Sequence, residues 1–330
     1  MKAVRWHAAR DVRVEEIADP GSPPAGWVRL RVEACGICGT DVEEYLHGPV
    51  VLRGAPLVLG HEVAGVVEEV GPDTSFAIGQ RVAVEGNLVC GRCPSCLRGE
   101  ANLCRDNEQL GLQRDGGLAE LMLAPEAVCA PIRSSVPPEL AALAEPLSVA
   151  VRAVRRGRVS GATVAVVGAG PVGLLLAQVA RLQGADRVVL VDPLASRRQL
   201  AVALGADEAV EPGAGGEYDV VFESAGNAAA VESSVLLTRR GGTTVLLGVT
   251  DQAVRLAMPD FLVAERTLLS SMSHVFDPDF TTAAELINER KLTLEPLITD
   301  QVPLDRAVSD GLDALVASPA DHVKVMVVNS

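Results

Sequence analysis

Four cysteines, Cys90, Cys93, Cys96 and Cys104, lie close together in a segment rich in glycine and proline. Their spacing is Cys-x2-Cys-x2-Cys-x7-Cys, and such a loop lets four thiolates converge without a helix or strand forcing them apart. Four thiolates suit a tetrahedral zinc ion with no open position, which is a structural site. An iron–sulfur cluster is the alternative, but the last spacing and the missing Cys-Pro ending fit it poorly. Packing alone gives no reason to gather four thiols in one loop.

A glycine-rich segment is the second chemical signal, because it follows the apolar run Thr163–Val167 and opens the helical stretch Val172–Leu182. Its first glycine permits a tight turn, its second lets a pyrophosphate approach the backbone, and its third allows the helix to pack closely on the sheet. The helix N-terminus then offers free N–H groups to the anion. The contacts predicted for a dinucleotide are Gly168, Gly170, Pro171, Val172 and Gly173.

The acidic residue Asp192 follows the next apolar run, Arg187–Val191. A carboxylate there can accept hydrogen bonds from both hydroxyls of an adenosine ribose and repels a 2′-phosphate, so NAD is favoured over NADP. Arg197 and Arg198 lie nearby and leave NADP open as the less favoured cofactor. A helix cap is the structural alternative for Asp192, although it does not explain the glycines upstream.

Two different sequence patterns along the chain indicate which strands and helices position these groups. From Lys2 to about Pro138, short β-rich runs such as Trp27–Val32 and Val63–Val70 alternate with Gly and Pro, which predicts a β-rich domain with long loops. From about Gly161, strands alternate with helices, which predicts a doubly wound parallel sheet. The expected strands are Thr163–Val167, Arg187–Val191, Tyr218–Phe222 and Thr243–Gly248, and the expected helices are Pro171–Gln183 and Ser196–Leu204. The last apolar run, Val323–Val328, is expected to rejoin the first domain as a strand.

Composition limits the function classes. The chain has 330 residues, 48% hydrophobic and 22% charged, which predicts a compact protein of about two domains. Its net charge of −14 disfavours nucleic acid and anionic membranes as partners. No segment resembles a secretion signal or a membrane span, so we expect a cytoplasmic protein whose seven cysteines are not paired as disulfides.

Several dispersed groups connect only through a family pattern. Singly, Cys38, His61 and Glu145 read as a buried cysteine, a loop histidine and a surface carboxylate. Together with the cysteine lobe and the glycine loop, they resemble the zinc-dependent medium-chain alcohol and polyol dehydrogenases over the whole chain. The matching segments, in order, are Gly36–Asp41, Gly60–Glu62, Glu145–Leu147 and Gly168–Gly173. The 2,3-butanediol, sorbitol and threonine dehydrogenase branch is the most similar, on Val4–His7, Asp11–Glu16, Glu44–Leu46 and the acidic Glu145.

The resemblance implies a catalytic zinc held by Cys38, His61 and Glu145, with Glu62 beside the metal and able to exchange as a ligand. An open fourth position would admit the substrate alcohol, whose pKa the metal lowers before hydride passes to the nicotinamide. Thr40 is then expected to hydrogen-bond the alcohol oxygen and pass its proton outward. The lobe would hold a second, structural zinc ion.

The sequence departs from the family at Glu43, where a proton-relay histidine is usual. Either Glu43 or His47 could carry the proton to solvent. In the cofactor domain, the segment Phe222–Gly226 resembles one that passes the riboses of the cofactor. The resemblance adds three cofactor contacts: Gly248 and Val249 by their backbone, and Lys324 at the pyrophosphate. A solvated lysine on an edge strand is the alternative for Lys324.

The expected fold is α/β, with a Rossmann sheet inserted in a β-rich GroES-like catalytic domain. The catalytic domain would comprise residues 1–138 and 275–330, with a zinc lobe at 86–106, and the NAD-binding domain residues 139–274. The expected enzyme is a homodimer or homotetramer that transfers hydride between NAD and a secondary alcohol, such as a vicinal diol or polyol. Two alternatives remain: a zinc-free quinone or enoyl reductase on the same scaffold, and a noncatalytic NAD-binding protein.

Overall fold

The computed structural model describes residues 1–329, which form two compact units. The first unit comprises Met1–Glu145 and the chain from Val275 onward, and the second comprises Pro146–His274. The sequence interpretation placed the first boundary after residue 138. In the structure the short helix α3 (Pro138–Ala141) packs on strands β3 (Trp27–Gly36) and β5 (Glu62–Val70), which keeps it with the first unit.

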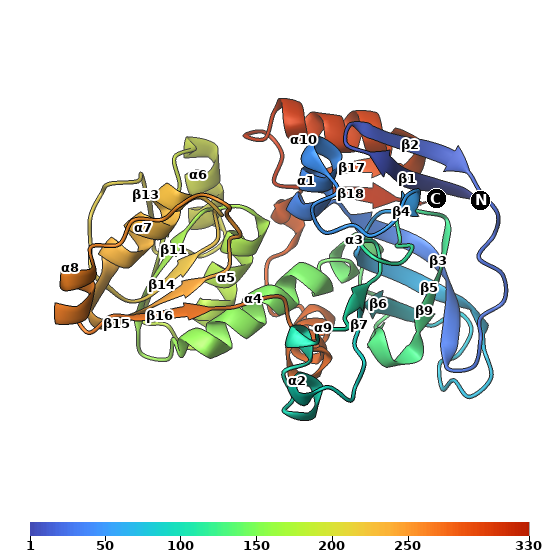
Figure 1. Cartoon of the computed structure of the whole chain (residues 1–330), viewed down its shortest axis with the longest axis horizontal. Coiled ribbons are helices and arrows are strands. Elements are labelled where there is room, and N and C mark those ends of the chain that lie inside the picture. The colour runs from blue at the N-terminus through green and yellow to red at the C-terminus, as the bar shows by residue number, and fades with distance from the viewer. Residues whose placement is uncertain (330) are drawn as a thin grey trace. The chain divides into compact units, whose positions relative to one another are not determined.

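The first unit is built on β-sheets, coloured blue to green and red in Figure 1. The largest sheet runs in the order β10-β6-β5-β3-β18-β17, and β9 also pairs with β3. A second sheet has the order β2-β1-β4, and β7 pairs with β8 beside the cysteine segment. The bounds of these further strands are β1 (Lys2–Ala8), β2 (Asp11–Glu16), β4 (Leu57–Val58), β6 (Arg81–Val84), β7 (Asn87–Leu88), β8 (Glu108–Gln109), β9 (Leu121–Pro125), β10 (Cys129–Ile132), β17 (Ile298–Pro303) and β18 (Lys324–Val328).

The last strand, β18, returns to this unit and inserts between β3 and β17. It runs antiparallel to β3, with Met326 opposite Gly36, while Gly36 is also opposite Glu62 of β5. The prediction that the final apolar run rejoins the first domain is therefore confirmed. Three strand segments far apart in the sequence therefore meet at this point of the sheet.

Alternating valine and leucine side chains of these sheets form the apolar core of the first unit, because every second residue of a strand faces the same side. Leu30, Leu59 and Leu118 are fully buried in it. Helix α1 (Gly39–His47) begins immediately after Cys38, which occupies its N-cap position. The remaining helices of the unit are α2 (Pro94–Leu97), α9 (Thr281–Asn288) and α10 (Asp313–Ala317), and α4 (Ala144–Gly157) begins at its boundary.

The second unit is a six-stranded parallel sheet in the order β13-β12-β11-β14-β15-β16, with α5, α6 and α7 packed on it (Figure 1). The inner strands β11 and β12 are largely apolar and buried, as strands covered by helices are. The strands are β11 (Thr163–Val167), β12 (Arg187–Val191), β13 (Glu208–Val210), β14 (Tyr218–Glu223), β15 (Thr238–Leu246) and β16 (Thr267–Ser270); the helices are α5 (Pro171–Leu182), α6 (Ala195–Ala203), α7 (Ala228–Leu237) and α8 (Met258–Val263).

This sheet confirms the predicted doubly wound α/β fold beside a β-rich domain. The order reverses between β11 and β14, which is where such sheets bind ligands at the carboxyl ends of their strands. The two outermost strands, β13 and β16, were not predicted, because they are short and β16 is largely exposed. Among residues 1–329, no helix is long and apolar enough to cross a membrane.

Candidate metal centres and nucleotide site

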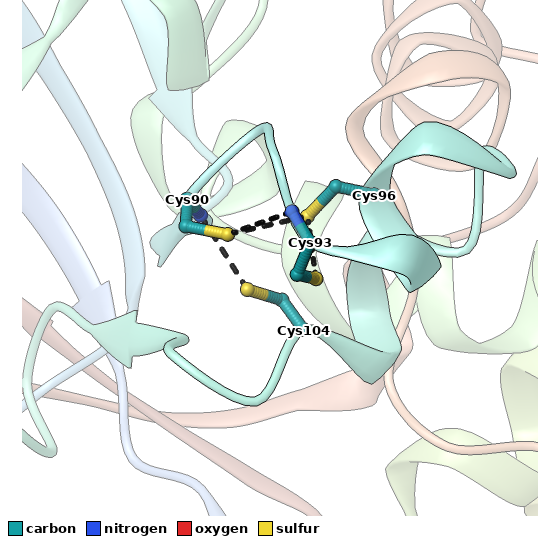
Figure 2. Close-up of side chains that lie close together, drawn as sticks. All are labelled: Cys90, Cys93, Cys96 and Cys104. Atoms are coloured by element: carbon teal, nitrogen blue, oxygen red, sulfur yellow. Dashed lines mark hydrogen bonds between the residues drawn. The ribbon is translucent and has the colours of Figure 1, made fainter.

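The sulfur atoms of Cys90, Cys93, Cys96 and Cys104 converge on one point, as Figure 2 shows. All four lie within 4.8 Å of one another, with 3.5 Å between the sulfurs of Cys93 and Cys96. The one-turn helix α2 starts after Cys93 and carries Cys96, so a helix contributes to this segment, contrary to the sequence expectation. Backbone N–H groups also point at the sulfurs, with Cys93 N 3.3 Å from Cys90 Sγ.

The electrostatics of this lobe favour a bound cation. A backbone N–H of Cys96 lowers the pKa of Cys93 to about 6, whereas burial and the neighbouring Cys93 raise the pKa of Cys96 to about 12. One thiolate therefore forms readily, and it opposes the ionisation of its neighbours. A divalent cation removes this repulsion, so the donor set fits a closed tetrahedral zinc site.

A second cluster of candidate metal ligands consists of Cys38, His61 and Glu62, whose ligand atoms also lie within 4.8 Å of one another. Cys38 stands at the start of α1, and Glu62 begins β5 directly after His61. Gly36 makes room for the carboxylate, because a Cβ there would lie 2.0 Å from Glu62 Oε2. His61 and Glu62 are buried, and Cys38 is half-buried.

Asp41, to which the sequence interpretation gave no role, lies against both Cys38 and His61. Its carboxylate is fully buried, accepts a hydrogen bond from Cys38 N at 2.9 Å and lies 3.8 Å from His61 Nδ1. Burial lowers the pKa of His61, but Asp41 and Cys38 raise it more, so that it lies well above its usual value. Carboxylates behind ligating histidines commonly fix the ring orientation. The thiol, imidazole and carboxylate of this cluster are donors that suit a divalent cation such as zinc.

The other residues predicted for the catalytic centre lie around this cluster. Glu145, in the first turn of α4, is buried and its charge raises the pKa of His61, although it stands outside the group of three converging ligands. Thr40 Oγ1 lies 3.9 Å from Cys38 Sγ. Glu43 and His47 are both exposed on α1, so either is accessible to solvent.

Lys324 is not the solvated lysine on an edge strand that the structural alternative predicted. It lies on β18, which is an interior strand, and it is only 3% exposed. Its Nζ donates to both oxygens of Glu62, at 2.6 and 2.7 Å, and to Ile37 O at 3.0 Å. These contacts engage all three donors of the ammonium in an ion pair at the metal-ligand cluster, and a contact of Lys324 with the pyrophosphate stays a prediction.

The glycine loop has the geometry that a dinucleotide requires. Gly168 has a φ of +101°, which favours glycine, and a Cβ at Gly173 would lie 1.8 Å from Gly168 O. At Gly170, in contrast, a Cβ would meet nothing within 4 Å, so this backbone is open to a ligand. Pro171 is the first residue of α5, followed by Val172, and proline is favoured at this position.

Asp192 lies beside this loop at the end of β12 and is 8% exposed. Its Oδ2 accepts from Ala169 N at 2.8 Å, and its Oδ1 accepts from Leu194 N at 2.9 Å, just before α6. The carboxylate thus braces the glycine loop as well as the start of α6. Arg197 is also buried, which lowers its pKa, while the charge of Asp192 opposes that shift.

Glu223 is a fully buried carboxylate in the segment Phe222–Gly226, which the resemblance places beside the cofactor riboses without giving Glu223 a role of its own. Its Oε1 accepts from the backbone N–H groups of Ala225 and Gly226, each at 2.8 Å. A Cβ at Gly248 would lie 2.3 Å from Gly226 N, so the turns after β14 and β15 touch each other. Val249 follows and is 78% exposed. Glutamate directly before Ser-Ala-Gly at a strand end was the available signal.

Comparison with known proteins identifies the class. Residues 24–134 match the alcohol dehydrogenase GroES-like domain, and residues 171–289 match the zinc-binding dehydrogenase family. The chain is 31% identical to (R,R)-butanediol dehydrogenase of Bacillus subtilis, over 99% of both chains. It is 33% identical to L-threonine 3-dehydrogenase of Pyrococcus horikoshii, over 85% of both.

A solved structure agrees with these relatives. A protein of Sinorhizobium meliloti 1021, assigned as a zinc-binding dehydrogenase and bound to NADP, superposes with a TM-score of 0.92 and is 36% identical, over 99% of both chains. The fold and site thus define an oxidoreductase with a nucleotide-binding sheet and two metal-ligand clusters. The chain belongs to the zinc-binding medium-chain dehydrogenases, a family of zinc-dependent, NAD(P)-linked enzymes that act on alcohols and polyols.

Proposed function

We propose that this enzyme transfers hydride reversibly between NAD and the secondary alcohol of a vicinal diol or polyol, giving the ketone. The observation that carries the proposal is the convergence of Cys38, His61 and Glu62, whose ligand atoms lie within 4.8 Å of one another. A zinc-free reductase has no need for a thiol, an imidazole and a carboxylate directed at one point.

In this proposal Cys38, His61 and Glu145 hold the catalytic zinc ion, with Glu62 beside it. The metal supplies Lewis-acid polarisation of the alcohol oxygen, and the nicotinamide supplies the hydride acceptor. Asp41 faces the imidazole, with its Oδ1 3.8 Å from His61 Nδ1, and its carboxylate offsets positive charge on that ring. Its hydrogen bond from Cys38 N fixes the backbone that carries the thiolate.

Thr40 is the proposed first acceptor of the alcohol proton, because its hydroxyl lies 3.9 Å from Cys38 Sγ and can accept one hydrogen bond while donating another. Glu43 and His47 lie farther along the same helix and are exposed. Either side chain can release the proton to solvent. Replacing each side chain in turn and measuring kcat against pH tells the two routes apart.

The proposed substrate class rests on the relatives. Butanediol and threonine both carry a second polar group on the carbon next to the reacting hydroxyl. A substrate with two adjacent polar groups can be oriented by one while the other reacts, and this is how a diol or polyol would be distinguished from a simple alcohol. A panel of diols, sugar alcohols and amino alcohols tests this assignment directly.

NAD is the proposed cofactor because Asp192 lies at the end of β12, where its charge repels a 2′-phosphate. Two observations favour NADP instead: Arg197 is buried near Asp192, and the Sinorhizobium relative binds NADP. The contacts proposed for the cofactor are Gly168, Gly170, Pro171, Val172, Gly173, Asp192, Arg197, Gly248 and Val249.

The cysteine lobe is proposed to hold the second zinc ion, with a structural role, since four thiolates leave no position for a substrate.

We also infer a homodimer or homotetramer. Strand β16 ends the parallel sheet and is largely exposed, with Met258, Leu262 and Val263 of α8 exposed as well. Exposed strand edges invite pairing, and a second copy would cover this one. Light scattering of the purified chain measures the oligomeric state.

The decisive experiment combines metal content with turnover. The purified enzyme is expected to contain two zinc ions per chain and to reduce NAD with a diol or polyol, and this turnover should disappear when the catalytic zinc is removed. Tight NAD binding without turnover on any member of the panel would instead indicate a noncatalytic protein. NAD(P)H-dependent reduction of quinones or enones by zinc-depleted enzyme would indicate the zinc-free reductase.

A further inference from the structure

The buried ion pair between Lys324 and Glu62 is unusual because it lies inside the proposed catalytic centre. The Lys324 side chain is only 3% exposed and the Glu62 side chain only 1%. The two residues are 262 positions apart in the sequence. The ammonium of Lys324 lies 2.6 and 2.7 Å from the two carboxylate oxygens of Glu62, which is a direct ion pair. A buried charge of this kind needs a partner, since an unpaired one is strongly destabilising.

We propose that Lys324 is a positioning residue that holds the Glu62 carboxylate beside the catalytic metal and keeps it from occupying a ligand position. This inference rests on the proposed zinc-dependent function. Lys324 binds both oxygens of Glu62, so a carboxylate that turns toward the metal has to break or share a charged hydrogen bond. The open position thereby stays available to the substrate.

Three contacts fix this arrangement. Ile37 O, next to the ligand Cys38, accepts the third donor of Lys324 at 3.0 Å and anchors the ammonium. Gly36 leaves the space that Glu62 fills, since a Cβ there would lie 2.0 Å from Oε2. Met326, two positions after Lys324 on β18, is opposite Gly36 on β3. The return of the C-terminal strand to the sheet is therefore what delivers this cation to the centre.

The alternative is that the pair only fastens β18 to β5. The two readings differ in what happens to Glu62 when the ammonium is removed. Under our proposal the uncompensated carboxylate, whose ligand atom already lies within 4.8 Å of those of Cys38 and His61, moves onto the metal. Under the alternative the strands loosen, and the ligand set of the metal stays unchanged.

The test compares Lys324→Met with Lys324→Arg, in whole enzyme whose catalytic zinc is replaced by Co²⁺ while the lobe retains zinc. Imidazole is the probe, because it takes an open metal position and changes the visible spectrum of Co²⁺. Lys324→Met is expected to weaken imidazole binding by about tenfold or more, as supporting-residue changes at metal sites commonly do. Lys324→Arg, which keeps the charge, is expected to bind imidazole close to the wild-type level.

The double variant Lys324→Met with Glu62→Gln separates positioning from packing. An amide has no charge to be neutralised by the metal, so imidazole binding should recover if Lys324 acts through Glu62. Wild-type imidazole affinity in Lys324→Met, or no recovery in the double variant, overturns the proposal. If Lys324→Met does not fold, Glu62→Gln alone decides: unchanged Co²⁺ affinity supports the proposal, and a marked loss shows that Glu62 is already a ligand.

Failure of this inference is distinguishable from failure of the proposed function. Wild-type enzyme that binds Co²⁺ at Cys38 and oxidises a diol, while the Lys324 variants leave imidazole binding unchanged, contradicts only the role of Lys324. Wild-type enzyme that neither binds Co²⁺ outside the lobe nor turns over any alcohol contradicts the proposed function itself.

Discussion

The two candidate metal centres of the first unit are assembled in opposite ways. The lobe takes four identical ligands from the single segment Cys90–Cys104, and α2 with its flanking turns brings them together. The other centre takes Cys38 from the start of a helix and His61 and Glu62 from the start of β5, and it is supported by Lys324 from the last strand. The first depends on local chain geometry, and the second on the completed sheet.

This difference in assembly indicates that the lobe contributes stability and the mixed centre contributes chemistry. A closed set of thiolates stabilises the segment that carries it, and it offers nothing to a substrate. A mixed set of thiol, imidazole and carboxylate, held by buried charges such as Asp41, keeps a metal reactive because the protein and not the ligand set fixes the geometry. Changes at the mixed centre should therefore remove chemistry, and changes at the cysteine lobe should reduce stability.

The largest effect is expected from Cys38→Ser. Loss of the thiolate removes the catalytic metal, whose Lewis-acid effect is worth several kcal/mol, so kcat should fall by about 10³-fold or more. NAD affinity, measured by fluorescence titration, should stay near the wild-type value because Gly168–Gly173 belongs to the other unit. Metal analysis should show one zinc ion fewer per chain. Full activity in this variant would contradict the assignment of the catalytic centre.

Cys104→Ser is expected to reduce the stability of the fold and to leave kcat unchanged. It leaves three thiolates around the structural ion and should lower the free energy of unfolding by more than about 3 kcal/mol, since structural zinc binding is coupled to folding. The fraction that remains folded should keep its kcat. Thermal unfolding together with turnover per folded molecule measures both. An unchanged midpoint with a reduced kcat would mean that the lobe serves chemistry, and the contrast between the centres would fail.

The same contrast explains what could be predicted from the sequence. The lobe and the glycine loop are local patterns, so Cys90–Cys104 and Gly168–Gly173 were recognisable from spacing and flanking residues alone. The parallel strands were recognisable as continuous apolar runs. The mixed centre required a family resemblance, because no spacing rule connects Cys38 with His61.

Long-range pairing is what the sequence could not reveal. Lys324 is a single lysine in an apolar run, and only the insertion of β18 between β3 and β17 shows that its ammonium meets Glu62. Asp41 looked like part of a motif, and its role depends on where His61 lies. Buried charges such as these are positioned by sheet register, which residue types alone do not specify.

A smaller effect is expected at Asp192, which links the glycine loop to the next strand. Asp192→Ala removes a charged acceptor worth about 1.5–3 kcal/mol, so kcat/KM with NAD should fall by roughly 10- to 100-fold while NADP is used relatively better. Asp192→Asn is the matched control, since its amide oxygen can still accept from Ala169 N, 2.8 Å from Oδ2. It should preserve stability better than alanine while losing the charge. An unchanged NAD/NADP ratio in both variants would remove Asp192 from cofactor selection.

The smallest effect is expected in the second unit, where no cysteine occurs. Hydrogen bonds from Thr163, assisted by Arg239, lower the pKa of Asp219 to about 2. Because its folded pKa is depressed, the stabilisation is complete above the unfolded pKa near 4 and is lost as the pH falls toward 2. Asp219→Asn should therefore lower the free energy of unfolding by about 1–2 kcal/mol at pH 7, allowing for partial solvent screening.

The pH dependence of that difference is the check. Urea unfolding of wild type and Asp219→Asn should give a constant gap between pH 7 and about pH 5, and the gap should narrow below about pH 4 as Asp219 takes up a proton. Zinc content should be equal in both proteins, because the carboxylate joins β11 to β14 and β15 and touches neither cysteine centre. A gap that widens on acidification would show that Asp219 is not stabilised as an anion, and a change in zinc content would show that the nucleotide-binding unit and the metal centres are not independent.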